Sequence, residues 1–115
     1  MVEPTQVIGA QPKRGAWLYV SNGSQVGRDF RLSRKTTIGR DTVQCDVILS
    51  DKKISEKHAR IQREGEEFVI YDLASLNGTF VNGKRVQKQL LNDNDEITVG
   101  MTKLVFKVTP KPPVR

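Results

Sequence analysis

Apolar and polar residues alternate with a period of two along most of residues 16–108. This period is typical of β-strands with one buried face, because successive side chains of a strand point to opposite faces. No stretch shows the periodicity of an amphipathic helix of useful length. The alternation predicts eleven short strands, over residues 17–21, 28–32, 35–39, 47–49, 59–64, 67–71, 79–81, 84–86, 89–91, 96–99 and 103–108.

Turn signals separate these strands, and the most informative are two Asn-Gly pairs, Asn77-Gly78 and Asn82-Gly83. Asn-Gly readily takes positive φ at consecutive positions, so each pair predicts a sharp reversal of the chain. Residues 75–77 then fall in a loop with sheet on both sides. Many short strands with frequent turns predict an all-β fold, an antiparallel β-sandwich of about eleven strands.

The two ends of the chain differ in composition from its middle. Residues 1–15 contain Pro4, Gly9, Pro12 and Gly15 with little periodicity, and residues 109–115 contain three prolines. We therefore expect a flexible leader at 1–15, one domain at 16–108 and a Pro-rich linker at 109–115. This arrangement indicates one module of a longer protein.

Composition narrows the class of protein. A chain of 115 residues with 37% hydrophobic content can form one core. The sequence has neither the ~20 consecutive apolar residues that span a bilayer nor a signal peptide, so we expect no membrane insertion. The single Cys45 excludes an internal disulfide, and one Cys with one His cannot form a metal cage. We predict a cytoplasmic protein without metal or other cofactor.

The formal charge of +6, from 19 Lys and Arg against 13 Asp and Glu, favours an anionic partner. Nucleic acid is not the expected partner, because the basic residues are dispersed and no aromatic residues interleave with them. Eight of the 19 lie in four short pairs, Lys13-Arg14, Arg34-Lys35, Lys52-Lys53 and Lys84-Arg85, and Lys111 and Arg115 lie near the end.

Three expected loops contain polar groups that suit a phosphate. Arg40 follows Gly39 at a strand end, Ser55 precedes another strand, and Asn77 follows a third. Loops at one end of a sandwich cluster, so these side chains are expected to converge. Arg supplies a planar fork of donors, Ser a hydroxyl, and Asn an amide that can pair with a peptide backbone. We interpret His58 as structural, with its ring bonded to loop backbone so that it holds Ser55 in position.

These residues belong to a set of motifs that resembles the forkhead-associated (FHA) domain family. The resemblance covers roughly residues 17–108 and implies an eleven-stranded β-sandwich that binds phosphothreonine peptides through loops at one end. Each motif alone is weak, but their order and spacing together are highly specific. The motifs are Ile38-Gly39-Arg40, Asp46-Val47-Ile48-Leu49, Ile54-Ser55-x-x-His58-Ala59, Asp72-Leu73-x-Ser75-x-Asn77-Gly78-Thr79, Val81-Asn82-Gly83, Asp95-x-Ile97 and Gly100.

The resemblance implies roles for individual residues. Arg40 and Ser55 would contact the phosphate, and Asn77 the peptide backbone beside it. Lys57 and Leu76, their chain neighbours, complete the expected phosphopeptide-binding set. The residues that would shape the loops are Gly39, His58 and Gly78. The implied function is non-catalytic phosphothreonine recognition within a larger signalling or secretion-related protein.

Two positions depart from the family pattern. Glu56 stands where Arg or Asn is common, and Leu76 where Thr is common. These changes favour an alternative, a phosphate-independent protein-interaction domain with a degenerate site. A hydrolase using Ser55 and His58 is a weaker alternative, because no carboxylate is placed to orient the imidazole.

Thr5 lies in the leader with an aliphatic residue, Ile8, three positions later. Related bacterial proteins resemble this arrangement in carrying a phosphorylated leader threonine. Thr5 is therefore a candidate phosphorylation site, and its segment a candidate ligand of the domain itself.

Overall fold

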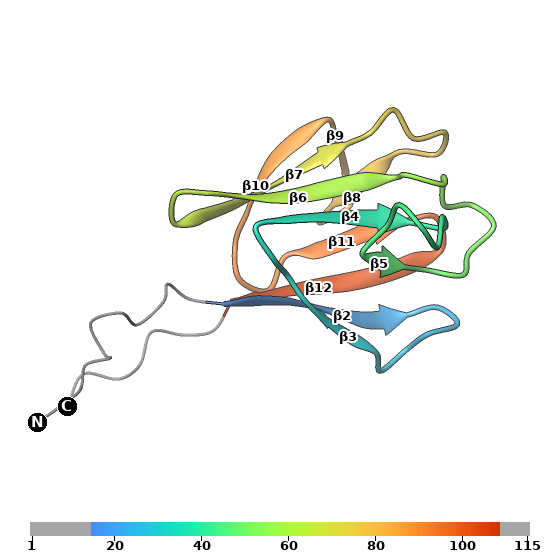
Figure 1. Ribbon diagram of the computed structural model, residues 1–115, viewed down its shortest axis with the longest axis horizontal. Coiled ribbons are helices and arrows are strands. Elements are labelled where there is room, and N and C mark those ends of the chain that lie inside the picture. Colours follow the sequence, from blue (N-terminus) through green and yellow to red (C-terminus); the bar gives the residue numbers. More distant parts are fainter. Residues whose placement is uncertain (1–14, 109–115) are drawn as a thin grey trace, which may run out of the picture.

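The computed structural model describes residues 15–108, which form eleven β-strands and no helix. Two sheets face each other (Figure 1). One has five strands in the order β10-β7-β6-β4-β5, and the other has six in the order β3-β2-β12-β11-β8-β9. The strands are β2 (Ala16–Asn22), β3 (Asp29–Arg31), β4 (Lys35–Gly39), β5 (Val47–Ile48), β6 (Ala59–Glu64), β7 (Glu67–Asp72), β8 (Thr79–Val81), β9 (Lys84–Val86), β10 (Lys88–Leu91), β11 (Glu96–Val99) and β12 (Thr102–Val108).

The core lies between the sheets and is built from the alternating positions of the strands. In β12, for example, Thr102, Leu104 and Phe106 are buried, and the residues between them are less buried. Phe106 meets Phe68 of β7 with ring centroids 5.6 Å apart and planes tilted by 59°. This contact joins the two sheets in one of the tilted geometries that aromatic pairs prefer. The prediction of an all-β sandwich is confirmed.

One strand pair departs from the antiparallel prediction. β4 and β5 run parallel, with Ile38 beside Val47 and Gly39 beside Ile48. A parallel pair needs a connection longer than a hairpin turn. Here residues 40–46 form that connection, and its path brings it to the same end of the sandwich as the β5–β6 connection.

The two Asn-Gly pairs have different conformations. Asn82 and Gly83 have φ of 52° and 84° and form the two-residue β8–β9 hairpin turn, as predicted. At Asn77-Gly78 only Gly78 has positive φ, at 92°. This pair ends the connection from β7 in one sheet to β8 in the other, so the expectation of a sharp reversal with two positive φ angles is wrong here.

The chain enters β2 and leaves β12 at the same end of the sandwich (Figure 1). The connections β4–β5, β5–β6 and β7–β8 all lie at the opposite end. We call this opposite end the loop end. The predicted leader and linker lie outside the described residues, apart from Gly15.

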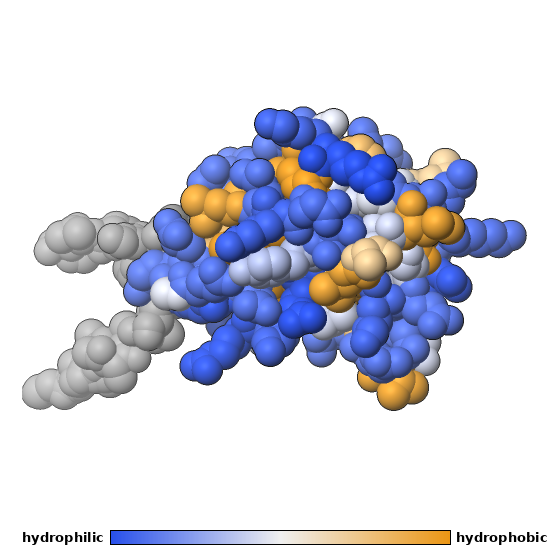
Figure 2. All heavy atoms as spheres, turned by 90° about the horizontal axis from the view of Figure 1, so that it is seen from above, coloured by the Kyte–Doolittle hydropathy of each residue, from blue (hydrophilic) through white to orange (hydrophobic). Residues whose placement is uncertain are grey.

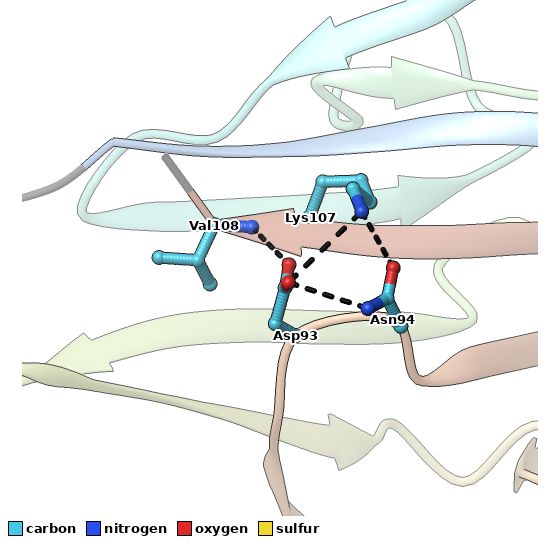
Figure 3. A network of polar contacts seen from close by, with 4 residues as sticks. All are labelled: Asp93, Asn94, Lys107 and Val108. Atoms are coloured by element: carbon cyan, nitrogen blue, oxygen red, sulfur yellow. Dashed lines mark hydrogen bonds and ion pairs between the residues drawn. The ribbon is translucent and has the colours of Figure 1, made fainter. Parts of the chain in front are cut away.

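At the end where the chain leaves, a polar network fixes the last residues of β12 (Figure 3). The Val108 backbone N–H donates to Asp93 Oδ1 over 2.8 Å, and Lys107 Nζ donates to Asn94 Oδ1 over 2.5 Å. Lys107 Nζ also lies 4.0 Å from Asp93 Oδ2. The network belongs to the β10–β11 connection and is remote from the loop end. Among residues 15–108 there is no helix that could cross a bilayer.

Candidate functional site

Arg40 follows β4 directly and is exposed. Its backbone and its Nε are bonded to the β5–β6 connection. Its backbone N–H donates to the carbonyl oxygen of Ser55 over 3.3 Å, and its Nε donates to that of Ile54 over 2.5 Å. Within residues 15–108 its terminal NH2 groups form no hydrogen bond or ion pair. The remaining donors of the guanidinium fork are therefore available to an anion beside Ser55.

Gly39 allows this close approach of β4 to the next connection. A Cβ atom on residue 39 would lie 2.1 Å from the carbonyl oxygen of Glu56 and 2.8 Å from Cys45 Sγ. The same Glu56 carbonyl accepts hydrogen bonds from the Asp41 N–H at 3.2 Å and the Cys45 thiol at 3.0 Å. Burial raises the pKa of the Cys45 thiol, which keeps it a protonated donor. The absence of a side chain at position 39 is thus a packing requirement.

His58 joins two of the three loops and is completely buried. Its Nδ1 accepts a hydrogen bond from the Ser55 backbone N–H at 3.0 Å, and its Nε2 lies 2.8 Å from the carbonyl oxygen of Gly78. A carbonyl can only accept, so Nε2 carries the proton and the ring is the neutral Nε2–H tautomer. The imidazole therefore contacts Ser55 through its backbone and does not act as a base toward its hydroxyl.

Ser55 and Asn77 each form a hydrogen bond between the β5–β6 and β7–β8 connections. Ser55 Oγ accepts a hydrogen bond from the Leu76 N–H over 3.0 Å, and Asn77 Nδ2 donates to the carbonyl oxygen of Lys53 over 2.8 Å. The Ser55 hydroxyl keeps its own proton to donate. Asn77 keeps its Oδ1 acceptor and a second N–H, which are the groups that pair with a peptide backbone.

Asp72, at the end of β7, organises the loop that carries Asn77. Its carboxylate accepts hydrogen bonds from Ser75 Oγ at 2.5 Å, the Ser75 N–H at 3.1 Å and Thr79 Oγ1 at 2.7 Å. Ser75 Oγ in turn accepts from the Gly78 N–H at 3.0 Å. Burial of Asp72 raises its pKa, but the hydrogen bonds from Ser75 and Thr79 outweigh burial and leave the pKa below its ordinary value.

Asp51 fixes the β5–β6 connection to the β11–β12 turn. It accepts hydrogen bonds from the Lys53 N–H at 2.9 Å, the Met101 N–H at 2.7 Å and Thr102 Oγ1 at 2.8 Å. Burial raises its pKa, yet these hydrogen bonds leave the pKa below its ordinary value. Asp51 therefore stays ionised and holds the segment that leads to Ser55.

Neither aspartate is a predicted site residue, although Asp72 begins the motif Asp72-Leu73-x-Ser75-x-Asn77-Gly78-Thr79. The signal for Asp72 was the spacing to Ser75, three residues later, since Asp side chains often bond to nearby backbone and hydroxyl groups in turns. Asp51 has a local partner in the Lys53 N–H, but its bonds to Met101 and Thr102, which are distant in sequence, had no sequence signal.

The surface around the loop end combines charged and apolar side chains. Glu56 and Lys57 are exposed, and within residues 15–108 the Glu56 carboxylate forms no ion pair. Leu76 and Val43 are 84% and 88% exposed. Figure 2 shows the molecule from above, with the loop end at the edge opposite the grey residues; hydrophilic residues cover most of this face, and separate hydrophobic residues interrupt them. The charged and apolar side chains of the loop end can contact both charged and apolar residues of a partner.

The structure brings Arg40, Ser55 and Asn77 into one loop cluster, with Lys57 and Leu76 exposed on the same loops. Gly39, His58 and Gly78 lie beneath them and join the loops. The cluster offers a guanidinium, a hydroxyl and an amide on a rigid base. It can bind an anion beside an extended peptide.

A family model described as the FHA domain matches residues 36–100, more than half of the chain. The chain therefore belongs to the FHA domain family. The matched residues include every site residue discussed above.

Curated relatives support the assignment. The chain is 38% identical over 100 residues to the glycogen accumulation regulator GarA of Mycolicibacterium smegmatis, an alignment that covers 87% of this chain and 63% of GarA. It is 36% identical over 95 residues to the oxoglutarate dehydrogenase inhibitor of Corynebacterium jeikeium, covering 83% of this chain and 66% of the inhibitor. The chain thus spans slightly less than two thirds of the length of these relatives.

Solved FHA domains share the fold. One, from a structural and functional analysis of phosphothreonine-dependent FHA domain interactions, has a TM-score of 0.78 and 32% identity over 84% of this chain and 99% of that one. Another is the FHA domain of FhaA in complex with the intracellular domain of Rv3910. It has a TM-score of 0.74 and 32% identity over 80% of this chain and 99% of that one.

Proposed function

We propose that this domain is a non-catalytic module that binds phosphothreonine on a partner protein. The observation that carries the proposal is the position of Arg40, whose Nε is bonded to Ile54 beside Ser55 while its terminal NH2 groups face no partner within residues 15–108. Arg40 and Ser55 would bind the phosphate, and Lys57 would add positive charge. Asn77 and Leu76 would contact the peptide on either side of it.

A working phosphate site requires that Glu56 face solvent. A carboxylate about 6 Å from a phosphate is repelled by roughly 3 kcal/mol per unit of phosphate charge at an effective dielectric constant of about 20. That repulsion would cancel most of the binding free energy from Arg40 and Ser55. Glu56 is exposed, which is what a side chain that faces solvent requires.

The second candidate function is phosphate-independent protein binding by the same loops. It is favoured by Glu56 and by the apolar Leu76, which is 84% exposed beside Asn77. A hydrolase is disfavoured by His58, because both ring nitrogens are bonded to backbone groups.

The proposed host is an intracellular regulatory protein of a signalling or secretion pathway. The names of two relatives, a glycogen accumulation regulator and an oxoglutarate dehydrogenase inhibitor, support a regulatory role. A single buried cysteine suits the reducing cytoplasm. We propose the cytoplasm as the location and a phosphorylated protein as the partner.

The proposed function includes a regulatory use of Thr5. The chain enters β2 at the end opposite the loops, so a phosphorylated Thr5 would have to travel the length of the sandwich to reach Arg40 (Figure 1). The seven residues of β2 span roughly 23 Å, and the eleven residue-to-residue steps from Thr5 to Ala16 extend to about 36 Å. The leader is long enough for phosphorylated Thr5 to occupy the domain's own site.

A binding screen tests the proposed function. The domain is titrated against a degenerate phosphothreonine peptide library, with phosphoserine and unphosphorylated libraries as controls. We expect the domain to bind the phosphothreonine library alone, or clearly more tightly than the phosphoserine and unphosphorylated libraries. Equal binding of phosphorylated and unphosphorylated peptides would favour the phosphate-independent function.

A further inference from the structure

Arg85 lies on β9 and extends to the loop that carries Asn77. A Cβ atom on Gly78 would lie 2.7 Å from Arg85 Nε, 2.9 Å from its Cζ and 3.2 Å from its Nη2. The guanidinium therefore rests on the bare backbone of Gly78. Gly78 is required by its φ of 92°, and the exposed end of the Arg85 side chain packs against the face that a Cβ atom would cover.

Strand register explains how Arg85 reaches this position. β8 and β9 are antiparallel with Phe80 beside Arg85, and Gly78 lies two residues before Phe80. The neighbours Thr79, Val81 and Val86 are buried, so Phe80 and Arg85 lie on the outer face of the sheet. The Arg85 side chain leans diagonally along this face toward the loop end.

The charge of Arg85 is not neutralised by the described part of the protein. Arg85 is exposed, and it forms no hydrogen bond or ion pair with any of residues 15–108. The carboxylate of Asp72, at the start of the β7–β8 connection, accepts three hydrogen bonds from Ser75 and Thr79. The planar Arg85 guanidinium, which has no acceptor among residues 15–108, thus lies against Gly78, the residue next to Asn77.

We propose that Arg85 is a second anion-binding position that pairs with an acidic side chain of the ligand, close to the phosphothreonine. The inference rests on the proposed function, which places the ligand backbone at Asn77. Adjacent Cα atoms are about 3.8 Å apart, so a ligand residue that passes Asn77 comes within reach of a guanidinium seated on Gly78. A carboxylate matches the fork in a bidentate geometry, which Lys would not provide. The domain would therefore select phosphothreonine sites with a nearby Asp or Glu.

The test uses a series of phosphothreonine peptides that differ only in the position of one Glu. A single Glu is moved through the positions on both sides of phosphothreonine in an otherwise neutral peptide, and each affinity is compared with that of the all-neutral phosphopeptide. The native domain is expected to prefer Glu at one or two adjacent positions by about threefold or more. Arg85→Gln should reduce that preference to near one and leave affinity for the neutral phosphopeptide within about twofold. Lys84→Gln, the same charge change one residue away on β9, should keep the preference.

Reversal of the charge at position 85 gives a second, independent test. Arg85→Glu should prefer Lys over Glu at the same ligand position. If the native preference for Glu is absent, or persists in Arg85→Gln, the inference is overturned while the proposed function stands. If the native domain does not distinguish phosphorylated from unphosphorylated peptides, the proposed function fails and the inference fails with it. Circular dichroism melting of each variant confirms that the fold is retained.

Discussion

The imidazole Nε2 of His58 lies 2.8 Å from the carbonyl oxygen of Gly78, and this buried hydrogen bond connects the β5–β6 and β7–β8 connections. Through Nδ1 the same ring fixes the Ser55 backbone. This one side chain, which is expected to have no contact with the ligand, therefore acts together with the Ser55–Leu76 and Asn77–Lys53 hydrogen bonds to set the relative position of Ser55 and Asn77.

Replacement of His58 by alanine should destabilise the domain by about 3 kcal/mol. Two buried backbone groups, the Ser55 N–H and the Gly78 carbonyl, would lose their partners, and each costs roughly 1 to 3 kcal/mol. Chemical denaturation measures the change. Lys57→Ala, one residue away and exposed, is the control and should change stability by less than about 0.5 kcal/mol. A His58→Ala domain as stable as the native one would contradict this role.

The Asp72 carboxylate should make stability depend on pH in the acid range. Its folded pKa is below the ordinary value of 3.8, so its contribution is fully present above that value and is lost as the pH falls through the folded pKa. Asp72→Asn should cost about 1 to 2 kcal/mol at pH 7, and this difference should shrink below about pH 4.

Thermal melts of native protein and Asp72→Asn from pH 2.5 to 7 test the prediction. Glu67→Gln, an exposed carboxylate on the same strand, is the control and should track the native protein. A difference that stays constant down to the lowest pH would show that the hydrogen bonds to Asp72 do not require its charge.

Replacement of Glu56 by glutamine tests whether its carboxylate faces the phosphate. If Glu56 points into solvent, where screening is strong, Glu56→Gln should change phosphopeptide affinity by less than about twofold, and Glu56→Arg should raise it. Titration calorimetry provides the affinities. Conversion of an undetectable interaction into a measurable one by Glu56→Gln would instead favour the phosphate-independent function for the native domain.

Phosphorylation of Thr5 should shift the backbone amide resonances of Ser55 and Asn77, because the phosphate would occupy their site. The measurement is a comparison of amide spectra before and after phosphorylation, with Thr5→Ala as the control. The shifts should persist on dilution if the contact is within one chain. Resonances of Ser55 and Asn77 that do not move would rule out this switch.

The fold was largely predictable from the sequence, because alternation identifies a strand locally. Residues 35–39 and 59–64 were predicted with the bounds that the structure has, and Asn82-Gly83 forms the expected hairpin. The parallel pairing of β4 with β5 was not predictable, since alternation within a strand does not specify its neighbour. At Asn77-Gly78 the hydrogen bonds from Ser75 Oγ to Asp72 and from the Gly78 N–H to Ser75 Oγ set the loop conformation in place of the pair's own turn preference.

The candidate site was predictable in part. Spacing and family resemblance identified Arg40, Ser55 and Asn77, and the structure places them on neighbouring loops. The position of Arg85 could not be read from the sequence, because Lys84-Arg85 is one of several similar basic pairs. Its contact with Gly78 depends on strand register and side-chain direction.

The most direct test of the central claim is the effect of Arg40→Ala on binding of the tightest phosphothreonine peptide from the library screen. A charge-assisted hydrogen bond contributes roughly 1.5 to 3 kcal/mol, so the account predicts a loss of affinity of about tenfold or more by titration calorimetry. Arg34→Ala, which removes an exposed arginine between β3 and β4, is the matched control and should bind within about twofold of the native domain. An Arg40→Ala domain that binds the phosphopeptide as tightly as the native one would contradict the account.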